Sequence, residues 1–199
     1  YFVNDGFVSG NLESVTNMGP SSQNISLLAY DTRDSSNLLT LSNVHNEHTG
    51  FLCGGMTVIP EVCNDAPPNS IPANTGTEFI VLQIHNYDID SIFLEDIAIN
   101  NVIHSWDSST SNVPLDAEFD CVSCPNRPYP ADGMFSIFPV GNNPTQNESI
   151  QIQSGQTVNL LIKLGSDDSD IQLNRGIHVR LDTGKIHTVD FFIEAGDAR

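Results

Sequence analysis

Short apolar runs separated by turn-forming residues recur along most of this chain. The clearest run covers residues 78–86, which are mostly apolar and rich in β-branched side chains, and it predicts a strand. Eight or nine strands at such spacing are typical of a sandwich, so the fold class we predict is all-β, an Ig-like antiparallel β-sandwich. The other predicted strands cover residues 25–30, 38–44, 93–103, 134–140, 149–153, 156–164, 176–181 and 186–193.

The segments between these strands predict how the strands are connected. We expect the strands at 78–86 and 93–103 to be a hairpin or neighbouring strands of a Greek key, and the last two strands to form a hairpin around residues 182–185. Two long stretches rich in Pro, Gly and Cys, residues 45–76 and 105–133, are predicted to be irregular insertions. The tail that follows Ile193 is expected to be frayed.

The N-terminal segment differs from the rest of the chain, because its apolar residues are not confined to one side. At 100° per residue, four apolar side chains form one stripe and three others are spread around the remaining surface. Such a segment needs partners on most sides, so we expect residues 1–18 to form an assembly segment and residues 19–199 a head domain. A helix is slightly favoured by the stripe, and a donated strand remains open. The predicted assembly residues are Tyr1, Phe2, Val3, Phe7, Val8, Leu12 and Val15.

The net charge of the chain argues against two classes of binding partner. The chain has 199 residues, with 25 acidic and 7 basic side chains and a formal net charge of −18. Nucleic acids and anionic membranes are bound through clusters of Lys and Arg, so this balance argues against both partners. Only 16% of the residues are charged, and a helical bundle would normally contain more Lys and Glu. An acidic extracellular surface is the plainest interpretation.

The start of the sequence predicts processing. It has no initiator Met and no apolar run of 18 residues, so we expect that a signal peptide, or the front of a longer hydrophobic helix, has been removed. If a hydrophobic helix has been removed, a membrane is expected to be a partner only before assembly. The sequons at Asn24 and Asn147 are candidate glycosylation sites in an exported protein.

Four cysteines predict two disulfides in an exported protein. The local pairing, Cys53 with Cys63 and Cys121 with Cys124, is favoured because both pairs lie in turn-rich segments, although the crossed pairings stay open. Closing a loop of about ten residues would stabilise the fold by about 2–3 kcal/mol.

No motif in the sequence predicts catalysis. A nucleophile elbow, a phosphate-binding glycine loop and a His-Glu-X-X-His motif are all missing, so we expect a protein that is not an enzyme, with no cofactor and no small-molecule substrate. The spacing of Cys121 and Cys124 suits a structural disulfide better than a redox site, since no βαβ context accompanies it.

Weak candidates for binding remain. His45 and His48 could contribute to a zinc or copper site, but two ligands on a loop are a poor signal, and our prediction is no metal. The acidic turn at Asp167 and Asp168 lacks the spacing of a calcium loop. Aromatic side chains in the second insertion either stack on a glycan or, more commonly, anchor their loop to the core. Those side chains are Trp106 and Tyr129.

Three stretches carry a family resemblance. Residues 7–14 resemble the end of the long N-terminal helix of archaeal type IV pilins and archaellins, and residues 78–86 and 97–100 are similar to strands of their heads. The opening of the strand after Gln153, Ser-Gly-Gln-Thr-Val, resembles a strand opener of the same heads. The sequence departs from that family because the hydrophobic core of the helix is absent before Tyr1.

The N-terminus also resembles fibre proteins of the TasA/camelysin group, which donate an N-terminal strand to the next subunit. Both resemblances imply a structural subunit of an extracellular, cell-surface filament that serves adhesion or motility. The partners would be copies of itself in a helical homopolymer. The alternative is an exported binding module, either an adhesin-type or a metal-binding or calcium-binding sandwich.

Overall fold

The computed structural model describes residues 25–32, 79–115, 128–141, 144–165, 171–172, 174–184 and 188–199, and the backbone of three short strands between residues 51 and 71. The described chain is all-β, as predicted, with one 3₁₀ helix at Ser108–Thr110. The main sheet has eight strands, in the order β1 (Ile25–Asp31), β5 (Phe79–Asn86), β11 (Thr157–Lys163), β9 (Met134–Pro139), β8 (Val102–Trp106), β7 (Asp96–Ile99), β13 (Gly176–Asp182) and β14 (Thr188–Glu194).

Short two-stranded pairs accompany this sheet. They are β6 (Ile92–Phe93) with β10 (Gln151–Ile152), β12 (Ile171–Gln172) with β4 (Ser70–Ile71), and β2 (Phe51–Cys53) with β3 (Met56–Val58). Strands β2, β3 and β4 lie within the region 45–76 that was expected to be irregular. The strand predicted at 38–44 falls outside the described residues.

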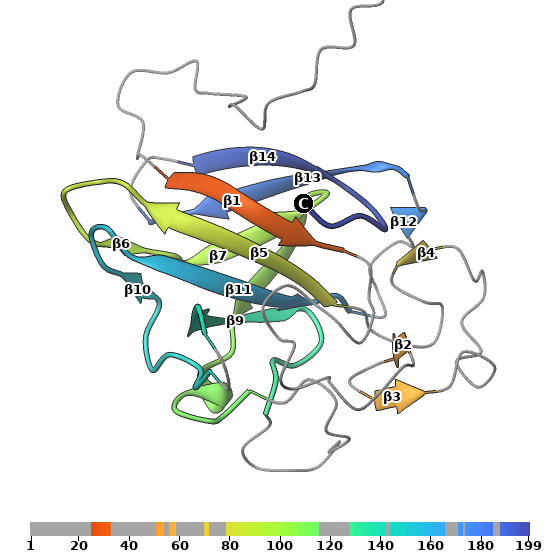
Figure 1. The fold of residues 1–199 in the computed structure, drawn as a ribbon, viewed down its shortest axis with the longest axis horizontal. Coiled ribbons are helices and arrows are strands. Elements are labelled where there is room, and N and C mark those ends of the chain that lie inside the picture. The colour runs from red at the N-terminus through yellow and green to blue at the C-terminus, as the bar shows by residue number, and fades with distance from the viewer. Residues whose placement is uncertain are drawn as a thin grey trace, which may run out of the picture.

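The sheet is mostly antiparallel and folds over on itself, so that the strands at its two ends come together (Figure 1). One pair of the main sheet departs from the predicted antiparallel arrangement: β8 and β9 are parallel and pair Ser105 with Met134 and Trp106 with Phe135. This short pair joins the layer formed by β1, β5, β11 and β9 to the layer formed by β8, β7, β13 and β14.

A single large core lies between the two layers. Strand β13 shows why it forms there, since Ile177, Val179 and Leu181 alternate with the outward side chains of His178 and Arg180. Alternate residues of a strand point to opposite faces, so a period of two builds one buried face. Strands β5, β9 and β11 contribute further buried aliphatic and aromatic side chains: Ile80, Leu82, Ile84, Phe135, Ile137, Val158, Leu160 and Ile162.

A second, smaller core covers the outer face of β5, β11 and β9. Its strand residues are Phe79, Val81, Phe138 and Leu161, and the insertion 105–133 supplies Leu115 and Tyr129. Because β5 and β11 are apolar on both faces, their sequences are continuous apolar runs rather than alternating ones. The second insertion therefore acts as a cover for the sheet.

The predicted strand at 93–103 is wrong in one respect, since the structure divides it into three pieces. Asn100 and Asn101 have φ angles of 49° and 73°, and they form the tight turn between β7 and β8. Two adjacent residues at positive φ are the signature of a type I′ hairpin turn, which Asn tolerates better than most residues. Val102, just after the turn, is exposed.

The expected pairing of 78–86 with 93–103 is also wrong. Strand β5 lies between β1 and β11, whereas β7 pairs with β8 and β13. The last hairpin is confirmed, because β13 and β14 pair from Gly176 with Glu194 to Asp182 with Thr188.

Candidate assembly edge

The two end strands of the main sheet, β1 and β14, lie side by side (Figure 1). No strand ladder joins them among the described residues. Within those residues, the edge of β14, and the edge of β1 up to the point where the tail bonds to it, have no partner strand. Unpaired strand edges are templates on which another strand can be added. We refer to this opening between β1 and β14 as the seam.

The C-terminal tail closes one end of the seam, which corrects the prediction of a frayed tail. After β14, the chain turns at Gly196, whose φ is 80°, and runs antiparallel to the end of β1. Tyr30 N–H donates to Arg199 O at 2.7 Å, and Arg199 N–H donates to Tyr30 O at 3.0 Å. Thr32 N–H donates to Asp197 O at 2.9 Å. These backbone bonds tie the tail to β1.

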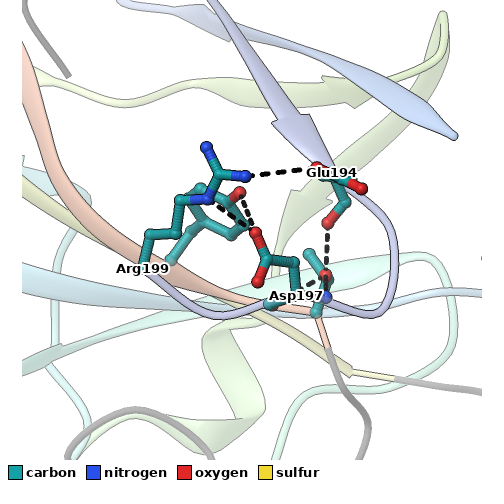
Figure 2. Close-up of polar contacts among 5 residues, drawn as sticks. Glu194, Asp197 and Arg199 are labelled. Carbon is teal, nitrogen blue, oxygen red and sulfur yellow. Dashed lines mark hydrogen bonds and ion pairs between the residues drawn. The ribbon is translucent and has the colours of Figure 1, made fainter. Parts of the chain in front are cut away.

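Side chains reinforce this attachment (Figure 2). Asp197 Oδ2 accepts the Tyr30 hydroxyl at 3.0 Å and Arg199 Nε–H at 2.7 Å. Arg199 also reaches the carboxylate of Glu194, with an Nη2–Oε2 distance of 3.3 Å. The fully buried Thr32 hydroxyl lies 2.6 Å from Glu194 O and accepts Asp197 N–H at 3.1 Å. We call these five residues the tail junction.

The tail junction shifts the pKa values of three of its members, Tyr30, Asp197 and Arg199. Burial, and then the hydrogen bond to Asp197, raises the pKa of Tyr30 above 10.0. Desolvation acts to raise the pKa of Asp197, but hydrogen bonds from Tyr30, Ala198 N–H and Arg199 together outweigh it and hold that pKa below 3.8. The junction therefore favours a neutral tyrosine beside an ionised aspartate.

Hydrogen bonds alternate in direction along an antiparallel pair, and this alternation identifies the backbone groups of β14 that point away from β13. Ala195 N–H donates toward β13 at Arg175 O, whereas Glu194 O faces the other way and lies near the Thr32 hydroxyl. Alternate residues of a strand share a direction, so the backbone groups of Phe192 and Asp190 also point into the seam. Within the described segments, no strand pairs with these groups.

The edge of β1 is irregular. The register with β5 shifts between Leu27 and Ala29, so Leu28 is an extra residue in β1, and its side chain is exposed. A bulge of this kind interrupts regular pairing along an edge strand. The uninterrupted edge of the seam is therefore that of β14.

Most of the residues predicted from the sequence to be functional fall outside the described part of the chain. These are the seven predicted assembly residues, Asn24, Cys63, Cys121 and Cys124, and the weak metal candidates His45, His48, Asp167 and Asp168. Cys53 ends strand β2, but its side chain is not described. The disulfide pairing and the assembly role of residues 1–18 stay predictions. Asn147 is described and partly exposed.

The aromatic side chains of the second insertion act as anchors. Tyr129 is buried and packs edge-on against Phe79, with 6.0 Å between ring centroids, and the Lys163 ammonium lies 4.7 Å from the centroid of its ring. Trp106 packs against the main core. A buried Tyr129 is not placed to stack on a glycan.

One histidine–carboxylate pair lies on the outer face of β13 and β14. His178 Nε2 is 2.7 Å from Asp190 Oδ1, which also accepts Arg180 Nε–H at 3.2 Å. The His178 ring stacks on Phe192, with 4.9 Å between centroids. No Ser, Thr or Cys side chain within the described segments hydrogen-bonds to this imidazole, so the pair gives no evidence of an activated nucleophile.

The tail junction was missed because its partners are far apart in sequence. Tyr30 and Asp197 are 167 positions apart, and short polar residues near a chain end are typical of fraying. One sequence signal could have predicted the attached tail. Gly196 is a turn-forming residue after a strong strand, and the three residues that follow it are enough to return along the sheet.

Comparisons with known proteins identify no family. No family model, curated protein or solved structure matches this chain. Across the described residues, no grouping of three or more His, Cys, Asp or Glu side chains is arranged to hold a metal ion, and no helix has the length and apolarity needed to span a membrane.

Proposed function

We propose that this chain is a structural subunit of an extracellular, cell-surface filament, and that it polymerises through its N-terminal segment with copies of itself. The observation that carries the proposal is the seam, where two edge strands lie next to each other and no ladder joins them in the part of the chain that the structure describes. A sheet edge of this kind binds an extended segment through backbone hydrogen bonds, largely independently of that segment's exact sequence.

The segment we propose as the added strand is the N-terminus of a neighbouring subunit. Residues 1–15 contain the seven predicted assembly residues and no basic residue, and they precede β1, one of the two strands that border the seam. The seam favours a donated strand over the helix that the apolar stripe slightly favours, because a helix cannot satisfy the backbone groups of a strand edge.

Added apolar contacts would supply the affinity. Burying one large apolar side chain contributes about 1.5–3 kcal/mol before ordering costs, and the segment offers three aromatic side chains, Tyr1, Phe2 and Phe7. Each subunit would both donate a segment and accept one, so the contact repeats along the polymer without closing. No enzymatic role is part of this proposal.

The decisive experiment removes one hydrogen-bond donor from the β14 edge. In Phe192→Pro, the backbone N–H that points into the seam is lost, and proline is tolerated on edge strands. We expect this variant to fold but to form no filaments by electron microscopy. The matched control, Phe192→Thr, loses the same ring but keeps the N–H, and it should still polymerise.

Deletion of residues 1–15 tests the donor. We expect the shortened chain to stay monomeric, and a synthetic peptide of residues 1–15 to bind it and to protect the β14 amides from hydrogen exchange. Filaments formed equally well by the shortened chain, or by Phe192→Pro, would contradict the proposed function.

A further inference from the structure

The C-terminal tail is itself a short strand on the seam edge of β1. Tyr30 N–H and Tyr30 O both bond to the backbone of Arg199, and Thr32 N–H donates to Asp197 O. Strand β5 pairs with the other edge of β1, so these backbone groups point toward the seam. Residues 197–199 therefore take the place beside the end of β1 that an added strand would take, and the marked C-terminus lies there in Figure 1.

The tail covers the regular part of that edge. Leu28 is an extra residue in β1, and the ladder with β5 is interrupted on the N-terminal side of Ala29. From Ala29 onward the register is continuous, and this is the part to which the tail bonds. A bulged edge does not form a regular ladder. A strand that pairs with β1 as well as with β14 therefore needs the backbone groups of Tyr30 and Thr32, which the tail already uses.

The main core is less completely covered along the seam than in the middle of the sheet. The core residues of β5 and β11 are fully buried, whereas Ile25 of β1 and Val189 of β14 are 7% and 8% exposed. Leu27 of β1 and Phe191 of β14 pack against the same core but are only partly buried. Both strands that border the seam thus present apolar side chains that a third strand could cover.

The tail is poorly suited to cover these apolar side chains. Two of its three residues, Asp197 and Arg199, are polar and bond to each other, and both are partly exposed. The third, Ala198, has a single methyl group and is only partly buried. The tail is therefore held by backbone hydrogen bonds and by a partly exposed ion pair, and pairs of that kind stabilise weakly.

Exchange of the tail for a more apolar strand would be favourable. The incoming strand would form again the hydrogen bonds that the tail gives up at Tyr30 and Thr32, so these contributions nearly cancel. The released tail would regain conformational entropy, which offsets part of the cost of ordering the incoming strand. The side chains then decide the outcome, and residues 1–15 bring seven large apolar side chains where the tail brings one methyl group.

We infer that the tail is a displaceable strand, which closes the β1 side of the seam in the free subunit and leaves when the segment of a neighbouring copy enters. The inference rests on the proposed function and adds the regulation of the same site. The incoming strand pairs first with β14, whose edge has no partner strand among the described residues, and then replaces the tail on β1. Until then, the tail protects the β1 edge from unspecific pairing.

Hydrogen exchange of the full chain distinguishes displacement of the tail from simple addition of a strand. In free subunits, the Arg199 amide should be protected, because it donates to Tyr30 O. In filaments, the Arg199 amide should exchange at least about tenfold faster, whereas the Tyr30 amide stays protected and the Phe192 amide becomes protected.

The outcomes separate the inference from the proposed function. An Arg199 amide that is equally protected in filaments means that the tail stays in place, which overturns the inference and leaves the proposed function intact. A chain that forms no filaments contradicts the proposed function, and the inference falls with it.

Two substitutions at Arg199 test how the tail limits assembly. Arg199→Pro removes the N–H that donates to Tyr30 O, whereas the matched variant Arg199→Ala removes the guanidinium and keeps the N–H. We expect the critical concentration for filaments to fall about threefold to tenfold in Arg199→Pro, the ratio that corresponds to one net backbone hydrogen bond. It should fall by less in Arg199→Ala. No fall in Arg199→Pro, or an equal fall in both variants, overturns the inference.

A crosslink tests the inference from the opposite direction. Asp31 and Ala198 face each other as a non-hydrogen-bonded pair, at which Cα atoms lie about 4.5 Å apart and a disulfide can form. The oxidised chain with Asp31→Cys and Ala198→Cys should form no filaments, and the same chain should form them after reduction. Wild type with and without the reductant is the control. Filaments formed equally well by the oxidised chain overturn the inference, since its tail cannot leave.

Discussion

Asp197 illustrates how one carboxylate holds a chain end in place. It accepts hydrogen bonds from Tyr30 and Arg199, which come from the two strands of the tail attachment. Its ionised form is the one that these donors favour, which is why its pKa is lowered. The neutral form of Tyr30 is favoured first by burial and then by its hydrogen bond to Asp197.

These pKa shifts predict a pH window for the attachment of the tail. A lowered pKa at Asp197 means that its contribution is present above 3.8 and is lost as the pH falls through the folded-state value. A raised pKa at Tyr30 means that its contribution is present below 10.0 and is lost as the pH rises further. We expect Asp197→Asn to lower the free energy of unfolding at pH 7 by less than about 1 kcal/mol, because the pair is partly exposed.

The measurement is the difference in unfolding free energy between wild type and Asp197→Asn as a function of pH. That difference should shrink toward zero as the pH falls below 3.8. A difference that is constant from pH 7 to pH 2 would mean that the charge of Asp197 does not attach the tail.

Strand boundaries in this protein depend on turn residues that the apolar pattern does not show. Residues 93–103 form one run with several apolar positions, yet Asn100 and Asn101 break it into a hairpin. Positive φ is costly for most side chains because Cβ approaches the carbonyl oxygen, and asparagine reduces that cost. The turn, rather than the hydrophobic pattern, places β7 beside β8.

Substitutions at Asn101 test this role. Asn101→Ala should destabilise the protein by about 1 kcal/mol, since alanine is disfavoured at a φ of 73°. Asn101→Gly should cost nothing or stabilise slightly, because glycine adopts positive φ freely. Urea denaturation of both variants measures the difference, and equal stability of the alanine and glycine variants would contradict the assignment of the turn.

In the proposed filament, the net charge of −18 would act against the assembly of subunits. Copies that carry this charge repel one another, and salt screens that repulsion over about 8–10 Å at ordinary ionic strength. The backbone hydrogen bonds and apolar burial proposed for the seam would be affected much less by salt.

We therefore expect filaments to form more readily as ionic strength rises from about 10 mM to 500 mM, where the screening length falls several-fold. Light scattering and pelleting at fixed protein concentration measure this dependence. Filaments that dissolve as salt is added would indicate that attraction between charges, rather than strand addition, holds the subunits together.

The sequence by itself determined the local structure. The period of two in β13 and β14, and the continuous apolar runs of β5 and β11, identify these strands without any long-range information. The composition determined the all-β class for a similar reason, since helix-favouring charged residues are scarce.

Only the tertiary structure decided which strands are neighbours. Four features join residues that are far apart in the chain. They are the parallel contact of β8 with β9, the place of β5 between β1 and β11, the cover formed by Leu115 and Tyr129, and the tail junction. Pairing at a distance is selected by packing and by the satisfaction of buried polar groups across the molecule, and neither leaves a periodic signal in a local window of sequence.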